Sequence, residues 1–344
     1  MTTFVYITLS GENHIKAFDM DSAGLLTLRQ EVPVPGGPSA LAIAPNGQTL
    51  YCTLRASREL AAFRFDDAGR LRLLGKRELD ADACYVSSDK TGRYLLAAYY
   101  RAGKVSVHQL NSDGSIASEV CSIPTAPRAH CIETDASNSY ALVPHPLDAN
   151  CVYQFLFDDR TGRLTPNPAA PVRAAGNGDG PRHFVFSLDQ RFVYTSNENG
   201  SSVTAFHFGD QNMAQAQDKS GGGTLSPIQT ISTLPDEFSG ANTCAQIHLH
   251  PAGRSLYVSN RGHDSIAVFS IDTDTGALTR RGWQPTESVP RVFNIDPSGR
   301  VLLAAGQGSG RAASYAIDPD NGSLEPQSVT DVGDTPMWVL FRQV

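Results

Sequence analysis

The stretch PSALAIAPNGQTLYCTLRASRELAAFRFDDAGRL, from Pro38 to Leu71, has a regular internal order. An alternating apolar run is followed by a Pro-Asn-Gly turn, a second apolar run and a polar loop. A third run then ends at an Asp-and-Gly turn, after which a fourth begins. Alternation with a period of two residues, broken by Pro, Gly, Asn and Asp, is typical of short antiparallel strands. The stretch therefore predicts a small antiparallel sheet of four strands.

The same order recurs along the chain, for example in TCAQIHLHPAGRSLYVSNRGHDSIAVFSIDTDTGAL (Thr243–Leu278) and in PRVFNIDPSGRVLLAAGQGSGRAASYAIDPDNGSL (Pro290–Leu324). Most of the units start about 45 residues apart, and two intervals are longer. Their starts fall near Pro38, Ala83, Ala129, Pro181, Cys244, Pro290 and Pro336. A period of this length with four strands per unit predicts an all-β, seven-bladed β-propeller. No segment has a sustained helical period, so we expect almost no helix.

The seventh unit is split between the two ends of the chain. Its first strand is PMWVLFR (Pro336–Arg342), and FVYITLSGENHIKAFDMDSAGLLTL (Phe4–Leu28) supplies the other three. Pairing of the N- and C-terminal strands would close the ring and remove an exposed sheet edge. We expect one propeller domain over residues 1–344. The extra length at Gly209–Pro227 is rich in Gly, Ser and Gln and predicts a mobile surface loop.

Composition narrows the class of partner. The net charge of −7 argues against nucleic acid, because phosphate backbones require a basic face. No segment has the roughly 18 apolar residues of a membrane span, so no membrane partner is expected. The six cysteines are scattered, and no secretory leader is recognised, which predicts reduced thiols and a cytoplasmic protein. The sequence leaves open whether the protein is a monomer or a dimer.

Polar residues gather where the units predict the mouth of the central channel. In a propeller, the loops before the first strand and after the second strand of each blade open on one face. These loops carry His130, Arg182, His183 and Arg291 before first strands, and Arg55, Glu198, Arg261 and Gln307 after second strands. Several arginines in one poorly solvated funnel would repel one another, which indicates an anion site. His248 and His250 lack a third ligand at suitable spacing, so no metal and no cofactor are predicted.

Several motifs resemble the seven-bladed β-propeller lactonase family over essentially the whole chain. They are GPRHFVF, NENGSSV, WQPTESVPRVFNIDPSGR, LLAAGQ and TPMWV. The resemblance is greatest to the bacterial 6-phosphogluconolactonase branch, and more distant to the muconate lactonizing enzymes. It implies hydrolysis of a small anionic lactone, above all 6-phospho-D-glucono-1,5-lactone, as a step of the pentose phosphate pathway. The alternatives are another lactone, a muconate cycloisomerisation, or a propeller that binds a partner and catalyses nothing.

The resemblance also implies the site. The family's His, Arg, Glu and second Arg match His130, Arg182, Glu198 and Arg261. Opening a lactone requires a base that takes a proton from water and donors that stabilise the oxyanion. Glu198 or His130 would be the base, and the sequence leaves that choice open. Arginine would stabilise the oxyanion or bind the anion. The expected substrate contacts are Arg55, Arg291, Gln307 and His183.

Overall fold

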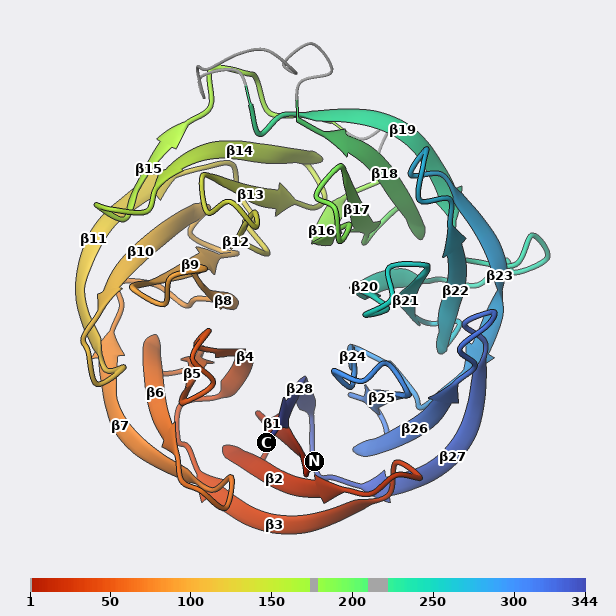
Figure 1. Cartoon of the computed structure of the whole chain (residues 1–344), viewed down its shortest axis with the longest axis horizontal. Helices are drawn as coiled ribbons and strands as arrows, with labels where there is room; N and C mark the ends of the chain where they lie inside the picture. Colours follow the sequence, from red (N-terminus) through yellow and green to blue (C-terminus); the bar gives the residue numbers. More distant parts are fainter. Residues whose placement is uncertain (1, 174–178, 210–221) are drawn as a thin grey trace.

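The computed structural model describes residues 2–173, 179–209 and 222–344, and its described part contains strands and no helix. The strands form seven four-stranded antiparallel sheets, arranged as a ring around a central channel (Figure 1). This arrangement confirms the predicted seven-bladed β-propeller. We number blades 1 to 6 in chain order from Pro38, and blade 7 contains both chain ends.

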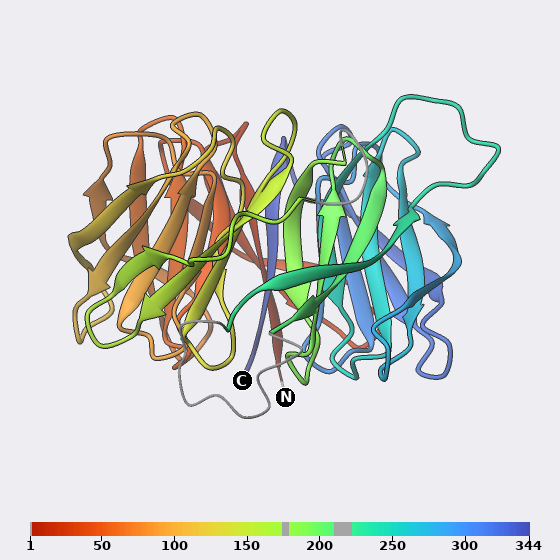
Figure 2. The ribbon, with the colours of Figure 1, turned by 90° about the horizontal axis from the view of Figure 1, so that it is seen from above.

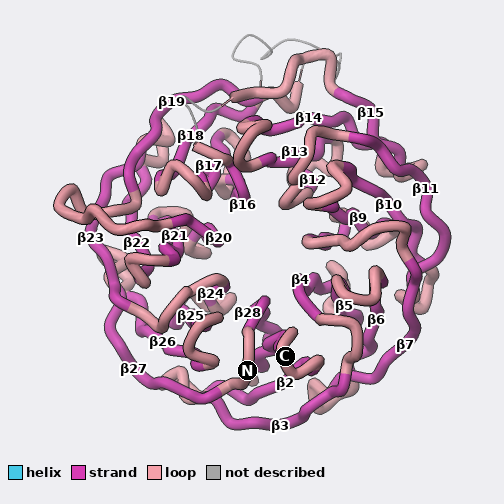
Figure 3. The backbone as a smooth tube through the Cα atoms, turned by 180° about the vertical axis from the view of Figure 1, so that it is seen from behind, coloured by secondary structure: helices cyan, strands magenta, loops and turns pink. Residues whose placement is uncertain are grey.

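In each blade the first strand named below lies nearest the channel and the last on the perimeter (Figures 1 and 3). Blades 1 to 4 comprise β4 (Pro38–Ile43), β5 (Thr49–Leu54), β6 (Glu59–Phe65) and β7 (Leu71–Glu78); β8 (Tyr85–Ser88), β9 (Tyr94–Tyr99), β10 (Lys104–Leu110) and β11 (Ile116–Pro124); β12 (Glu133–Thr134), β13 (Tyr140–His145), β14 (Cys151–Asp158) and β15 (Arg163–Pro166); and β16 (Pro181–Phe186), β17 (Phe192–Asn197), β18 (Ser202–Phe208) and β19 (Leu225–Ser232).

Blades 5 to 7 comprise β20 (Thr243–Leu249), β21 (Ser255–Arg261), β22 (Ser265–Ile271) and β23 (Leu278–Pro285); β24 (Val292–Ile295), β25 (Val301–Gly306), β26 (Arg311–Ile317) and β27 (Leu324–Asp331); and β28 (Pro336–Gln343), β1 (Thr3–Leu9), β2 (His14–Met20) and β3 (Leu26–Pro33).

Blade 7 closes the ring as predicted. β28 pairs antiparallel with β1, from Thr3 opposite Gln343 to Leu9 opposite Pro336. The two chain ends lie on one face of the disc, and the inner strands begin on the other face (Figure 2). We call the face on which the inner strands begin the entry face. It carries the loops that precede these strands, such as residues 233–242 before β20.

The turns explain why the strands end where they do. In the turn between β24 and β25, Asp296 accepts hydrogen bonds from the backbone N–H groups of Arg300 and Val301, both at 2.7 Å. Asp66 accepts two backbone hydrogen bonds in the same way between β6 and β7. Asp side chains that bind their own turn favour chain reversal over strand continuation. The repeated Asp-and-Gly motif therefore fixes the length of each strand.

Adjacent blades are joined by a repeated tyrosine contact. A tyrosine in the second strand of one blade donates its hydroxyl hydrogen to a backbone carbonyl in the outer turn of the next blade. The pairs are Tyr6 with Gly69, Tyr51 with Gly114, Tyr94 with Arg160, and Tyr257 with Gly322. A buried hydroxyl requires such a partner, so these contacts fix the register of neighbouring blades.

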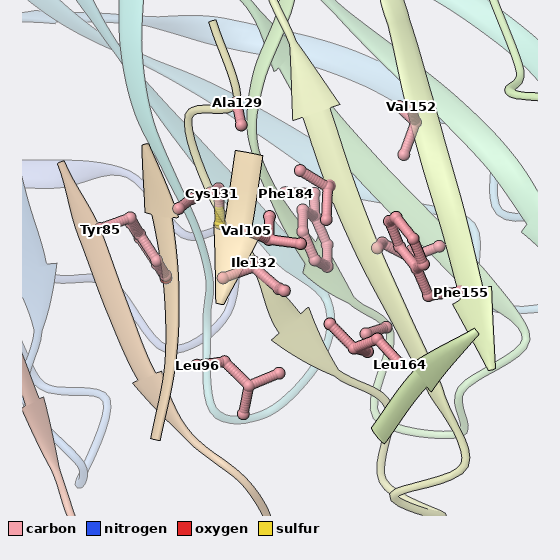
Figure 4. Packing of buried hydrophobic residues seen from close by; sticks show 14 of the residues in the cluster. Tyr85, Leu96, Val105, Ala129, Cys131, Ile132, Val152, Phe155, Leu164 and Phe184 are labelled. Atoms are coloured by element: carbon pink, nitrogen blue, oxygen red, sulfur yellow. The ribbon is translucent and has the colours of Figure 1, made fainter. Parts of the chain in front are cut away.

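Apolar side chains fill the spaces between the blades. Figure 4 shows one cluster, in which Tyr85, Val105, Ile132, Phe155 and Phe184 come from blades 2, 3 and 4. Phe155 is almost completely buried, and removing such a ring costs about 3–5 kcal/mol. The contacts between sheets hold the ring rigid, and the inner strands position the polar side chains of the channel.

Two sequence expectations concern loops and membranes. Leu225–Pro227, expected within the surface loop, instead form the start of β19. Residues 210–221 of the same expected loop lie outside the described residues. Among the described residues, no helix is long and apolar enough to cross a membrane.

Candidate active site

Arg182 lies at a β-bulge at the start of β16. Pro181 pairs with Asn197 and His183 pairs with Ser196, so the register shifts at Arg182. A bulge turns a side chain away from its regular direction. Arg182 and the next residue, His183, therefore line the same cavity, although neighbours in a regular strand point to opposite faces. The Arg182 side chain is only 2% exposed.

Glu198 lies between two of the predicted arginines. It directly follows β17, and its backbone N–H donates to the Gly180 carbonyl at 2.7 Å. Arg261 donates to Glu198 Oε1 at 2.6 Å, and Arg182 Nε lies 3.6 Å from Oε2. The side chain of Glu198 is 18% exposed. The structure thus brings together three of the four residues that the resemblance implied as catalytic.

The charges of this cluster shift the pKa values of its members. Burial raises the pKa of Glu198, but Arg182 and Arg261 outweigh burial and hold this pKa below its usual value. Burial lowers the pKa of Arg182 to about 9, while Glu198 opposes that shift. At neutral pH the carboxylate is ionised and the guanidinium is protonated.

Arg182 retains donor groups that the described residues do not use. Its Nε and one terminal nitrogen are buried and have no hydrogen-bond partner among them, and the same holds for Glu198 Oε2. A buried charged donor without an acceptor is costly, and native proteins keep few of them. Such donors beside the channel are available to an acceptor oxygen from outside the protein, either of water or of a ligand.

His130, the fourth implied residue, pairs with His183. His130 precedes β12, and its Nδ1 lies 3.2 Å from Nε2 of His183. The two side chains are 7% and 6% exposed. Burial, followed by the charge of Arg182, lowers both pKa values well below the usual one, so both rings are neutral at neutral pH. The expected role of His183 as a substrate contact stays a prediction, but its ring clearly packs on His130.

A small cavity on the channel axis connects these residues. Its volume is about 10 Å³, close to the space that one water molecule needs. It is lined by Ser39, Cys84, His130, Arg182, His183, Gln246, Arg291, Val292, Met337 and Trp338. A substrate much larger than water must therefore lie above this cavity, toward the entry face.

The other expected substrate contacts differ in their surroundings. Arg291 lines the cavity, and burial, followed by the charges of Arg261 and Arg55, lowers its pKa to about 10. Arg55 is paired with Asp82 at 3.0 Å. Gln307 Nε2 lies 3.6 Å from the sulfur of Met337, which lines the cavity. The backbone N–H of Gln307 donates at 2.9 Å to the Val289 carbonyl, which also accepts from the backbone N–H of Arg291.

Sequence reasoning missed several lining residues. Trp338 from β28 packs edge-on against Tyr85 and lies beside His183, with ring centroids 5.6 and 6.0 Å apart. Gln246 in β20 accepts a hydrogen bond from the backbone of Phe293 at 2.9 Å. Both residues lie in an inner strand, as Arg182 does, so the same reasoning from the blade pattern could have predicted that they line the channel.

No metal centre is found in the part of the chain that the structure describes. It contains no group of three or more His, Cys, Asp or Glu side chains placed to hold an ion. His250 Nε2 contacts the Gly299 carbonyl at 2.8 Å, and His248 packs edge-on against Phe293. A larger groove of about 900 Å³ lies between blades 5 and 6, but none of the expected site residues lines it.

The fold and the channel together define a β-propeller with a buried, positively charged polar site on its axis. The family model "Lactonase, 7-bladed beta-propeller" matches residues 4–341. The chain belongs to this family of seven-bladed β-propeller lactonases.

Individual relatives cover the chain from end to end. A 6-phosphogluconolactonase of Pectobacterium carotovorum is 34% identical over 343 residues, which is 98% of either chain. A 6-phosphogluconolactonase of Erwinia tasmaniensis is 32% identical over 344 residues and the full length of both. The solved structure of the periplasmic gluconolactonase PpgL of Pseudomonas aeruginosa superposes with a TM-score of 0.87, at 27% identity over all of both chains.

Proposed function

We propose that the protein hydrolyses 6-phospho-D-glucono-1,5-lactone to 6-phosphogluconate, in a reaction that needs no metal ion. The names of the full-length relatives support this substrate. The observation that carries the proposal is Arg182, two of whose buried nitrogens have no hydrogen-bond acceptor among the described residues and lie in the same cavity wall as the neutral ring of His130. A lactone carbonyl oxygen that becomes negatively charged is the acceptor that these donors fit.

His130 is the base in this proposal. Glu198 Oε1 already accepts a hydrogen bond from Arg261, and Arg182 and Arg261 hold the pKa of Glu198 below its usual value, so its carboxylate is a poor acceptor for a proton of water. His130 is neutral at neutral pH and lines the cavity. Its Nδ1–H donates to His183 in the tautomer we propose, which leaves Nε2 to take the proton. His183 thereby positions the ring of His130.

The chemical steps then balance. The oxygen of water forms a bond to C1 of the lactone while His130 Nε2 takes one of its protons. The carbonyl oxygen becomes an oxyanion that Arg182 stabilises, a contribution of roughly 3–4 kcal/mol for one well-placed donor. The bond between C1 and the ring oxygen breaks, and the ring oxygen receives the proton from His130. The new carboxylic acid ionises and releases one proton.

In this scheme Glu198 positions the two arginines and does not take a proton from water. It compensates the charges of Arg182 and Arg261 and holds both guanidinium groups in place at 3.6 and 2.6 Å. Preorganised donors contribute more than donors that must reorient during the reaction. Glu198 is therefore a positioning residue for the oxyanion site.

The test is a lactone assay with purified protein. Freshly prepared 6-phosphogluconolactone and unphosphorylated gluconolactone are followed by acid release between pH 6 and 7, against a buffer blank. We expect faster turnover of the phosphorylated lactone. Faster turnover of the plain lactone would favour the second candidate, a gluconolactonase, which the name of the Pseudomonas relative supports. Rates equal to the blank for both, from a folded protein, would refute lactone hydrolysis.

We also propose that the protein works in the cytoplasm. All six cysteines are unpaired, and five of them are buried, as suits a reducing compartment. The Pseudomonas relative is described as periplasmic, so the compartment needs its own test. Activity in the spheroplast fraction supports the proposal, whereas activity released with the periplasmic fraction contradicts it.

A further inference from the structure

Arg291 is held at the mouth by a loop with a fixed backbone. Its N–H donates to the Val289 carbonyl at 2.7 Å, immediately before β24. Val289 in turn donates its own N–H to Asp264 Oδ1 at 3.0 Å. The same oxygen accepts from Gly262 N, at 3.1 Å, next to Arg261. Asp264 thus ties the backbone of the loop that carries Arg291 to the turn that follows Arg261.

Arg291 differs from its neighbours because the described parts of the chain provide no counterion for it. Arg55 is paired with Asp82, and Arg182 and Arg261 share Glu198. Among the residues that the structure describes, the side chain of Arg291 forms neither an ion pair nor a hydrogen bond. Within the described residues, three guanidinium groups of this cluster share two carboxylates in ion pairs, and Arg291 adds a fourth, so the four exceed their ion-pair partners by two positive charges.

Two excess charges in a partly buried site select a ligand by its charge. A phosphate monoester carries about −1.5 to −2 at pH 7 and has three acceptor oxygens, so it compensates both charges. A neutral sugar lactone compensates neither. The planar guanidinium also binds phosphate through two parallel hydrogen bonds, which a single hydroxyl group cannot accept.

The position of Arg291 also fits the shape of a phosphorylated lactone. His130 and Arg182 precede or lie in β12 and β16, whereas Arg291 precedes β24 and Arg55 follows β5. Figure 1 shows β12 and β16 on the side of the channel opposite β24 and β4. In a six-membered sugar lactone the C6 substituent and the C1 carbonyl lie at different ends of the molecule. His130 and Arg291 line the same small cavity from these two sides, and in one pose a lactone above the cavity directs C1 to His130 and C6 to Arg291.

We propose that Arg291 is the specificity-determining residue of this site and that it receives the phosphate monoester of the substrate, with Arg55 as the second donor. The inference rests on the proposed function and deepens it. It assigns the preference for a phosphorylated over a plain lactone to one residue outside the four that the resemblance identified as catalytic.

The test compares kcat/KM for 6-phosphogluconolactone and gluconolactone in the parent and in Arg291→Gln. We expect the ratio of the two values to fall about 10- to 100-fold, since a hydrogen bond between charged groups is lost. Arg291→Lys keeps the charge but not the planar fork and should lose less of the ratio. Arg300→Gln is the matched control, because Arg300 lies in the same blade in the turn on the opposite face; it should keep the parental ratio.

A binding measurement separates this inference from the proposed function. Calorimetry compares 6-phosphogluconate with gluconate on the parent and on Arg291→Gln, and it requires no turnover. We expect the parent to bind 6-phosphogluconate at least 10-fold more tightly than gluconate. In Arg291→Gln the ratio of the two dissociation constants should fall at least 10-fold. Equal binding of both acids to the parent overturns the inference, even where lactone is hydrolysed. An unchanged ratio of kcat/KM in Arg291→Gln overturns it as well.

Discussion

Replacement of Glu198 by Gln tests how the buried charge cluster serves catalysis. Gln keeps the shape of the side chain but removes the charge that faces Arg261 at 2.6 Å and Arg182 at 3.6 Å. At an effective dielectric of about 20, a unit charge pair near 4 Å is worth roughly 4 kcal/mol before desolvation is counted. The guanidinium of Arg182, which is 2% exposed, would then lose the only counterion that the described residues give it, and leave its position.

The expected kinetic loss follows from that displacement. Removing one oxyanion donor costs about 10²–10³ in kcat, so we expect kcat of Glu198→Gln to fall ~100-fold or more. The free energy is roughly 2.7 kcal/mol at the lower end. KM should change modestly, because the loss falls on the transition state. Initial rates of acid release with 6-phosphogluconolactone measure both constants. Glu59→Gln is the control, since Glu59 pairs with Lys76 and does not line the cavity.

The pH profile decides which group is the base. With His130 as the base, kcat/KM falls as the pH drops through the lowered pKa of His130, because a protonated ring cannot accept a proton. Glu198→Gln should keep this acidic limb at its reduced rate, and His130→Ala should be inactive. A Glu198→Gln variant without the limb would make Glu198 the base. Parental activity in both variants would mean that the site lies elsewhere.

Four further results are expected. Arg182→Lys keeps the charge but loses the planar fork, so steady-state kinetics should show a higher KM and a lower kcat; parental kinetics would mean that charge alone suffices. Exhaustive chelation should leave lactonase activity unchanged because the arginines repel a cation; activity lost with EDTA and restored by a divalent ion would contradict this. Tyr257→Phe removes the hydrogen bond to Gly322 and should lower the unfolding free energy in urea by about 1 kcal/mol, with unchanged activity; unchanged stability would deny the contact a role. Buried histidines with lowered pKa values bind protons only after unfolding, so the unfolding free energy should fall as the pH drops below about 6.5. The loss is up to roughly 1.4 kcal/mol per pH unit for each histidine, and urea titrations measure it. Equal unfolding free energies at pH 7 and pH 5 would refute this. These histidines are His108, His130, His145, His183 and His248.

The sequence was most informative where a local pattern determines structure. Alternation and Asp-and-Gly turns predicted the blades, and the start of each inner strand located Arg182 and Arg291. The pairing of Arg55 with Asp82 could not be predicted, because it depends on how neighbouring blades approach each other. The bulge at Arg182 also lacks a sequence signal, since no glycine or proline marks the residue itself. The contact between His130 and His183 joins two neighbouring blades, so it could not be predicted for the same reason.

The closure of blade 7 also completes the wall of the channel. Met337 and Trp338, which line the cavity beside His183, belong to β28, whose pairing partner β1 lies at the other end of the sequence. A chain that stops before Pro336 lacks this wall and leaves the hydrogen-bonding edge of β1 without its partner. Every earlier blade can be finished while the site is still open on one side. The proposed site is therefore complete only when β28 has paired with β1, so lactonase activity would report that the ring has closed.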